Sequence, residues 1–208
     1  GHEVLPRIVD MSMSLGFSGP GLMITGENTY KSAGKDVEDF MSDGGYDMTV
    51  HLSGNATFEC VDNAVRLGRE TGCRFILAVG GGNKIDTAKL TAKKLGVHFI
   101  SIPTSASHDG IASGRASLKS STKSKSVEAV SPMGILADTG VITAAPFRYL
   151  VSGCADVISN ISALADWEMS RKNNNEFFSS SAYQMSMMAA ETIIENSKAI
   201  KPDDEECT

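Results

Sequence analysis

This chain of 208 residues has few cysteines, no long apolar run and no excess of positive charge. The four cysteines, Cys60, Cys73, Cys154 and Cys207, show no CxxC spacing, so we expect reduced, buried thiols and neither a zinc knuckle nor a disulfide framework. No apolar run approaches the roughly 18 residues that a membrane span needs. The first residues also lack a basic region followed by an apolar core. These absences predict a cytoplasmic protein without a membrane span.

Positive charge is also limited, because 19 Lys and Arg residues stand against 25 Asp and Glu residues, a formal charge of −6. The lysines are spread among serines and are not gathered on one helix, which argues against nucleic-acid binding and favours a small-molecule ligand. With 41% apolar residues, the chain has enough material for one buried core and part of a second.

Residues 21–104 alternate short apolar runs with amphipathic stretches, which predicts an α/β fold with a Rossmann-like parallel sheet. We expect strands at 21–26, 48–52, 75–79, 98–103 and 134–138, and helices at 29–43, 57–72 and 84–95. The Ser- and Lys-rich stretch 112–130 predicts a hairpin or a mobile flap.

Beyond Pro146 the sequence has only helical signals, at 151–169 and 181–199. We therefore expect a dinucleotide-binding domain at 1–146 and, at 147–208, the beginning of an all-helical metal and substrate domain. Two helices are too few for an independent core, so this second domain is expected to be incomplete. The acidic residues 201–208 are expected to be frayed.

Two candidate sites follow neighbouring predicted strands. At residues 79–86 (VGGGNKID), three glycines lead from a buried strand into a helix, and the exposed N–H groups with the positive helix end can hold a pyrophosphate. A sharp turn with no ligand is the alternative. At 103–110 (PTSASHDG), three hydroxyl groups and Asp109 can bind phosphate, carboxamide or a ribose or substrate hydroxyl. Here a turn that satisfies its own backbone is the alternative.

The third candidate is Asp156 with Asn160, which share a helix face at i, i+4 just after the expected domain boundary. They could therefore point into a cleft between the domains. An acidic residue in a first helical turn commonly serves as a cap or complements the helix dipole, so a metal role is one of two interpretations. The histidines His51 and His98 lie in strand patterns, where packing explains them.

The segments GGGNKIDTAK, PTSASHDGIAS and GCADVISNISALADWE, in this order, resemble the sn-glycerol-1-phosphate dehydrogenases. These belong to the superfamily of metal-dependent glycerol and alcohol dehydrogenases that includes dehydroquinate synthase. The resemblance implies reversible NAD(P)H-dependent reduction of dihydroxyacetone phosphate to sn-glycerol 1-phosphate, the backbone of archaeal ether phospholipids. A homo-oligomer is expected.

The resemblance also implies roles for particular residues. NAD(P)H would be bound by Glu27, near the adenosine ribose, by Gly80, Gly81, Gly82, Asn83, Lys84 and Asp86 at the pyrophosphate, and by Thr104, Ser105, Ala106, Ser107 and Ser113 on the nicotinamide side. Asp109 would contact substrate. Asp156 would contact substrate and bind a catalytic zinc ion. An acid near the ribose would repel a 2′-phosphate, yet members of this branch use either NADH or NADPH, so the coenzyme preference stays open.

The chain departs from the family pattern at the metal site. The family's other two metal ligands are histidines, and no histidine follows Asp156 in this sequence. Catalytic zinc normally has three protein ligands, so we expect a chain that is incomplete at its C-terminal end. Two alternatives remain, a glycerol or other polyol dehydrogenase of the same superfamily and a nucleotide-binding module without catalysis.

Overall fold

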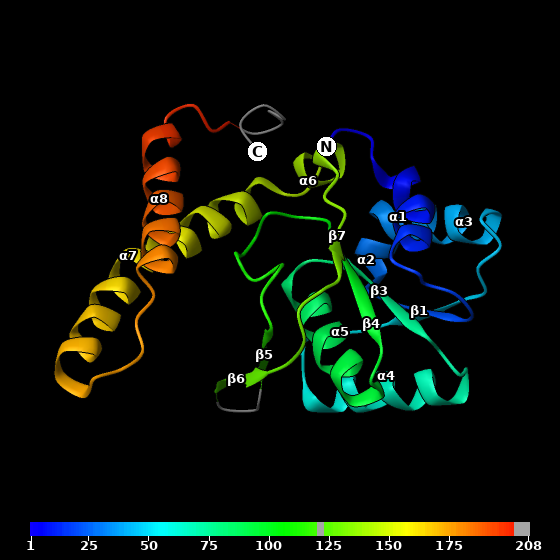
Figure 1. The fold of residues 1–208 in the computed structure, drawn as a ribbon. Coiled ribbons are helices and arrows are strands. Elements are labelled where there is room, and N and C mark those ends of the chain that lie inside the picture. The colour runs from blue at the N-terminus through cyan, green and yellow to red at the C-terminus, as the bar shows by residue number, and fades with distance from the viewer. Residues whose placement is uncertain (120–122, 202–208) are drawn as a thin grey trace. The chain divides into compact units, whose positions relative to one another are not determined.

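The computed structural model describes residues 1–119 and 123–201, and its first part is built on a five-stranded parallel sheet (Figure 1). The strand order is β2-β1-β3-β4-β7. The strands are β1 (Gly21–Thr25), β2 (Met48–Leu52), β3 (Phe75–Gly80), β4 (His98–Pro103) and β7 (Gly134–Ile135). In the parallel register Gly80 pairs with Pro103, so β3 and β4 end side by side. The predicted α/β fold is thereby confirmed.

Helices cover both faces of this sheet. They are α1 (Ile8–Ser14), α2 (Glu27–Thr29), α3 (Lys35–Asp43), α4 (Phe58–Glu70), α5 (Gly82–Leu95) and α6 (Thr139–Thr143), with a 3-10 turn η1 (Leu5–Arg7) and a π-helical segment η2 (Tyr30–Gly34). Alternate residues of β3 enter different cores. Leu77 packs with Ile8 and Val37 on one face, whereas Ile76 packs with Ala64 and Ile85 on the other. Cover on both faces explains why the central strand is apolar at every position.

The Ser- and Lys-rich stretch forms an antiparallel hairpin of β5 (Arg115–Lys119) and β6 (Ser124–Glu128). Residues 120–122, which connect these strands, lie outside the described part of the chain. Leu118 is fully buried and packs with Val61 and Leu90, so the inward face of β5 adds to the core formed by α4 and α5. Of the two predicted alternatives for this stretch, the described residues form the hairpin.

The chain divides into two compact units, one of residues 1–105 and 110–145, the other of residues 106–109 and 146–208. The second unit contains α7 (Phe147–Asn174) and α8 (Ser180–Asn196), which pack against each other. In these helices only Gly153, Leu164 and Ala190 are buried among the described residues. The Trp167 indole N–H donates to the carbonyl of Phe177 at 2.9 Å and helps to fix the turn between the helices.

None of the helices in residues 1–119 and 123–201 has the length and apolar character needed to cross a bilayer.

Several sequence-based expectations require correction. The predicted helix 29–43 begins at Glu27 and includes the π-helical segment. The strand expected at 134–138 is only two residues long, because Asp138 caps α6 by accepting from the Gly140 amide at 3.0 Å. Of the cysteines, Cys73 is buried as expected, but Cys60 and Cys154 are partly exposed. Cys207 and most of the acidic C-terminal stretch, from 202 on, lie outside the described residues.

His98 was expected to be packed, but it is exposed at the first position of β4.

Candidate active site

The glycine turn after β3 requires glycine for steric reasons. Gly80 has a φ of +154°, and a Cβ atom at this position would lie 2.5 Å from Cγ of Lys84. Helix α5 follows at Gly82, and its N-cap residue Gly81 has no side-chain cap within the described structure. The first N–H groups of an α-helix have no partner inside the helix, and the helix dipole adds positive potential there. The turn therefore fits an anionic group such as a pyrophosphate.

Side chains of Asn83 and Lys84 tie this helix start to the loop after β2. The Lys84 ammonium donates to the carbonyls of Ser53 and Gly54, and Asn83 Oδ1 accepts from the amide of Ala56 at 3.3 Å. Burial lowers the pKa of Lys84, while the nearby Cys60 acts in the opposite direction. These two side chains thus support the turn, and the main chain of the turn is the part suited to phosphate.

Glu27 lies at the neighbouring strand end, where α2 begins directly after β1 and Gly26. Its side chain is exposed. Gly26 lies against Lys84, because a Cβ atom at Gly26 would be 2.6 Å from Lys84 Cε. The start of α5 therefore lies close to the end of β1.

Asp86 lies one turn into α5, where both of its carboxylate oxygens have protein partners. Oδ2 accepts from the Ser117 amide at 3.0 Å, and Oδ1 is 3.4 Å from the Lys89 ammonium. The residue is thus joined to the start of the β5–β6 hairpin. Its expected contact with the coenzyme stays a prediction.

The loop after β4 begins beside the glycine turn. The Thr104 amide donates to the carbonyl of Gly80 at 3.3 Å, and both Thr104 and Ser105 are buried. Ala106 and Ser107 are half-buried. Ser113, further along, has its hydroxyl group bonded internally, since its Oγ lies 3.1 Å from the Lys89 ammonium and 3.3 Å from the carbonyl of Arg115.

A hydrogen bond joins Asp109 to Asp156 within the second unit. The Asp109 amide donates to Asp156 Oδ2 at 3.0 Å, and Asn160 Nδ2 donates to Asp109 Oδ2 at 3.2 Å. Both Asp156 and Asn160 lie on α7, at the i, i+4 spacing noted in the sequence. Gly153, one turn earlier, allows the close approach, because a Cβ atom there would lie 1.9 Å from the Ala106 carbonyl oxygen. The structure therefore brings Asp109, Asp156 and Asn160 together.

The described residues do not form a complete metal site. Within residues 1–119 and 123–201, no group of three or more His, Cys, Asp or Glu side chains is arranged to hold a metal ion. Asp109 and Asp156 supply two carboxylates, whereas catalytic zinc normally takes three protein ligands, usually with histidine among them. The described residues alone therefore do not fit the expected zinc ion.

A parallel sheet whose central strand runs into a glycine turn is typical of dinucleotide-binding α/β folds. The chain belongs to the iron-containing alcohol dehydrogenase family, whose model matches residues 1–146. The predicted resemblance to glycerol-1-phosphate dehydrogenases is confirmed. The glycerol-1-phosphate dehydrogenase [NAD(P)+] of Methanosarcina acetivorans is 45% identical over 205 residues, which cover 99% of this chain. The chain spans 58% of the length of that curated relative.

Solved structures show the same fold. A probable glycerol dehydrogenase from Sinorhizobium meliloti superposes with a TM-score of 0.83 at 18% identity, over 99% of this chain and 60% of that one. A sulfoacetaldehyde reductase from Bifidobacterium kashiwanohense, solved in complex with NAD+, superposes with a TM-score of 0.65 at 23% identity, over 76% of this chain and 48% of that one. At these identities the likeness concerns the fold.

Proposed function

We propose that this protein is an NAD(P)H-dependent sn-glycerol-1-phosphate dehydrogenase, which interconverts dihydroxyacetone phosphate and sn-glycerol 1-phosphate for the synthesis of ether phospholipids. The observation that carries the substrate assignment is the 45% identity to a glycerol-1-phosphate dehydrogenase over nearly the whole chain. A homo-oligomeric state and a cytoplasmic location rest on the family resemblance and on the sequence composition.

In this proposal residues 1–146 hold the dinucleotide. The main chain of the turn Gly80–Asn83 binds the pyrophosphate, because its glycines let phosphate oxygens reach the N–H groups at the start of α5. Thr104–Ser107 and Ser113 line the nicotinamide side, and Glu27 contacts the adenosine ribose. When bound, the coenzyme supplies or accepts a hydride. The NAD+ complex of the structurally similar reductase supports a dinucleotide at this kind of fold.

Residues 147–208 contribute to the substrate site. The Asp109 amide and the Asn160 amide group hold the two carboxylates in a fixed arrangement, with Asp156 half-buried and Asp109 exposed. We expect Asp109 to accept a hydrogen bond from a substrate hydroxyl, and Asp156 to orient the oxygen that is reduced. Fixed acceptors of this kind favour one orientation of a small hydroxylated substrate over others. No step is assigned to a metal ion, because the described residues do not form its site.

The test is reduction of dihydroxyacetone phosphate, followed by the loss of NADH or NADPH absorbance, by the protein and its Asp156→Ala variant. We expect activity with the phosphorylated ketone in clear preference to dihydroxyacetone, and a loss of at least about a hundredfold in Asp156→Ala, typical of removing a group that acts on the reacting centre. Asp166→Asn removes an exposed carboxylate from the same helix and should leave the rate unchanged.

Three results would contradict the proposal. Equal rates with glycerol and glycerol phosphate in the reverse reaction would indicate a general polyol dehydrogenase. Tight dinucleotide binding without turnover of either substrate would indicate a non-catalytic nucleotide-binding module. Undiminished activity of Asp156→Ala would remove Asp156 from the site.

A further inference from the structure

A lysine side chain is completely buried in the helix that follows the glycine turn. Lys89 has no exposed surface, although α5 presents Ile85, Ala88 and Ala92 to the same interior. A charged ammonium group inside a protein is costly unless every N–H is paired. An apolar side chain would suit the helix face better if packing were the only demand.

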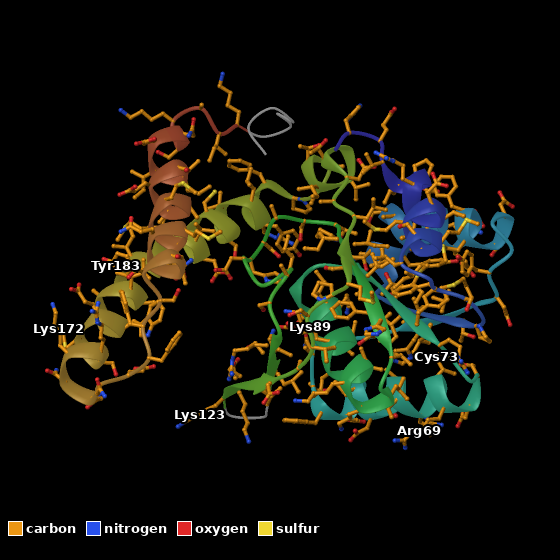
Figure 2. All side chains as sticks on the ribbon, in the orientation of Figure 1. Arg69, Cys73, Lys89, Lys123, Lys172 and Tyr183 are labelled. Atoms are coloured by element: carbon orange, nitrogen blue, oxygen red, sulfur yellow. The ribbon has the colours of Figure 1, made fainter. Side chains whose placement is uncertain are left out.

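The partners of the ammonium show what it holds. Lys89 Nζ donates to the carbonyl of Gly110 at 2.5 Å, to the carbonyl of Arg115 at 2.8 Å and to Ser113 Oγ at 3.1 Å. Its charge is balanced by Asp86 Oδ1 at 3.4 Å. Three partners of one ammonium thus come from a single segment of six residues, Gly110–Arg115. Figure 2 labels Lys89 on α5.

The Asp86 carboxylate extends the same attachment to the hairpin. Its second oxygen, Oδ2, accepts from the amide of Ser117, so Lys89 and Asp86 together fix the chain from Gly110 to Ser117. Residues 110–114 are neither helix nor strand. The Gly114 carbonyl accepts from the Ala129 amide, whereas the carbonyls of Gly110 and Arg115, at the two ends of segment 110–115, accept from the buried ammonium.

This segment matters because it follows Asp109 directly and contains Ser113. We infer that Lys89 is a positioning residue, whose ammonium sets the path of residues 110–117 and thereby shapes the nicotinamide side of the coenzyme site. The inference deepens the proposed function and rests on it for the identity of the ligand. The attachment itself is a property of the chain without ligand.

The test compares Lys89→Met, which removes the ammonium but keeps an unbranched side chain one atom shorter, with Lys94→Met on the same helix. Lys94 is exposed and pairs with Asp62 at 2.6 Å, so it is a matched control. Two readouts are needed. The first is amide hydrogen exchange of residues 110–117 relative to β1 and β3, and the second is the dissociation constant for NADH and NADPH from nucleotide fluorescence.

In Lys89→Met we expect exchange of residues 110–117 to become at least about tenfold faster, because three acceptors and one carboxylate lose their common partner. Exchange of β1 and β3 should be unchanged, and the dissociation constant should rise about tenfold. Lys94→Met should alter neither readout. A uniform change along the chain, no change, or faster local exchange with unaltered nucleotide affinity would overturn the inference.

If Lys89→Met does not fold, Asp86→Asn answers the same question. This substitution removes the balancing charge and retains an oxygen acceptor for the Ser117 amide, so a smaller but local gain in exchange over 110–117 is expected. Unchanged exchange in Asp86→Asn would overturn the inference. If the unmodified protein binds neither nucleotide, the proposed function fails, while the exchange pattern still decides whether Lys89 fixes the segment.

Discussion

Replacing Gly153 by alanine tests the close contact that lets the Asp109 amide reach the Asp156 carboxylate. An alanine Cβ would lie 1.9 Å from the Ala106 carbonyl oxygen, whereas ordinary contacts begin at 3.4 Å. Helix α7 and residues 106–109 would therefore have to separate by 1.5 Å, the difference between these two distances. The bond from the Asp109 amide to Asp156 Oδ2 is already 3.0 Å long and would not survive this shift.

Two effects of this substitution oppose each other. Alanine in place of glycine inside a helix gains about 1 kcal/mol of helix propensity. Overpacking against backbone costs about 1–3 kcal/mol, and each of the two lost hydrogen bonds at Asp109 costs about 0.5–1.5 kcal/mol. The clash should therefore win, with a net loss of about 1–5 kcal/mol in local stability.

The assay is hydrogen exchange at the Asp109 amide. A loss of about 2 kcal/mol corresponds to a roughly thirtyfold fall in protection of this amide. Ser152→Ala, at the exposed neighbouring position of α7, should leave the protection intact. If Gly153→Ala keeps the protection and unfolds at the same or a higher temperature, then α7 does not approach the Ala106 carbonyl as described.

Two further predictions concern the sheet and its edge. Burial, and secondarily the Lys84 ammonium, lowers the pKa of His51. The unfolded chain therefore binds more protons, and stability should fall as the pH drops below about 6.5, the pKa of an unperturbed histidine. Urea unfolding at about pH 5 and pH 7 should show this loss of stability in the unmodified protein and in His98→Gln. The loss should be smaller in His51→Gln. Equal losses in all three proteins would contradict the assignment to His51. Thermal unfolding should show that Gly80→Ala lowers stability by about 1–3 kcal/mol. Gly54→Ala should be neutral, because there is open space around Gly54. An unchanged unfolding midpoint in Gly80→Ala would refute the steric need for glycine at this turn.

Much of the first unit could be predicted from the sequence because local signals and tertiary packing agree there. Thr57 caps α4, with its side chain accepting from the Cys60 amide at 3.1 Å. Gly96 ends α5 with a φ of +70°, a conformation that glycine adopts without strain. The continuous apolar run of β3 correctly indicated a strand that is covered on both faces.

Elements that depend on distant partners were missed. Helix α1 was not predicted, since its burial comes from packing across the sheet face at Ile8. The early start of the second helical stretch has a local cause that was also missed, because Thr29 Oγ1 accepts from the Gly26 amide at 2.9 Å. Strand β7 is short because Asp138 also accepts from the backbone amides of Glu3 and Leu5. The Asp138 contacts span more than 130 residues and leave no periodic pattern.

The candidate site divides in the same way. The family resemblance led to Asp109 and Asp156, and the structure joins them by a hydrogen bond from the Asp109 amide to Asp156 Oδ2; their roles stay predictions. Lys89 was missed, because a lysine is normally assigned to a solvated face. A signal was present, since Lys89 follows the buried positions Ile85 and Ala88 along α5. The role of Lys89 becomes visible only with its buried acceptors, which lie on residues 110–115, a segment that packs against α5 in the folded chain.

The short segment 106–109 is assigned to the second unit, although it is flanked on both sides by residues of the first. A polypeptide cut after Ala145 would therefore separate Asp109 from Asp156, leaving neither fragment with the bonded pair. Chimeras that exchange the helical part among relatives should transplant residues 106–109 together with α7. Otherwise the chimera would combine Asp109 of one parent with α7 of another, and the bond between Asp109 and Asp156 would depend on residues that come from different proteins.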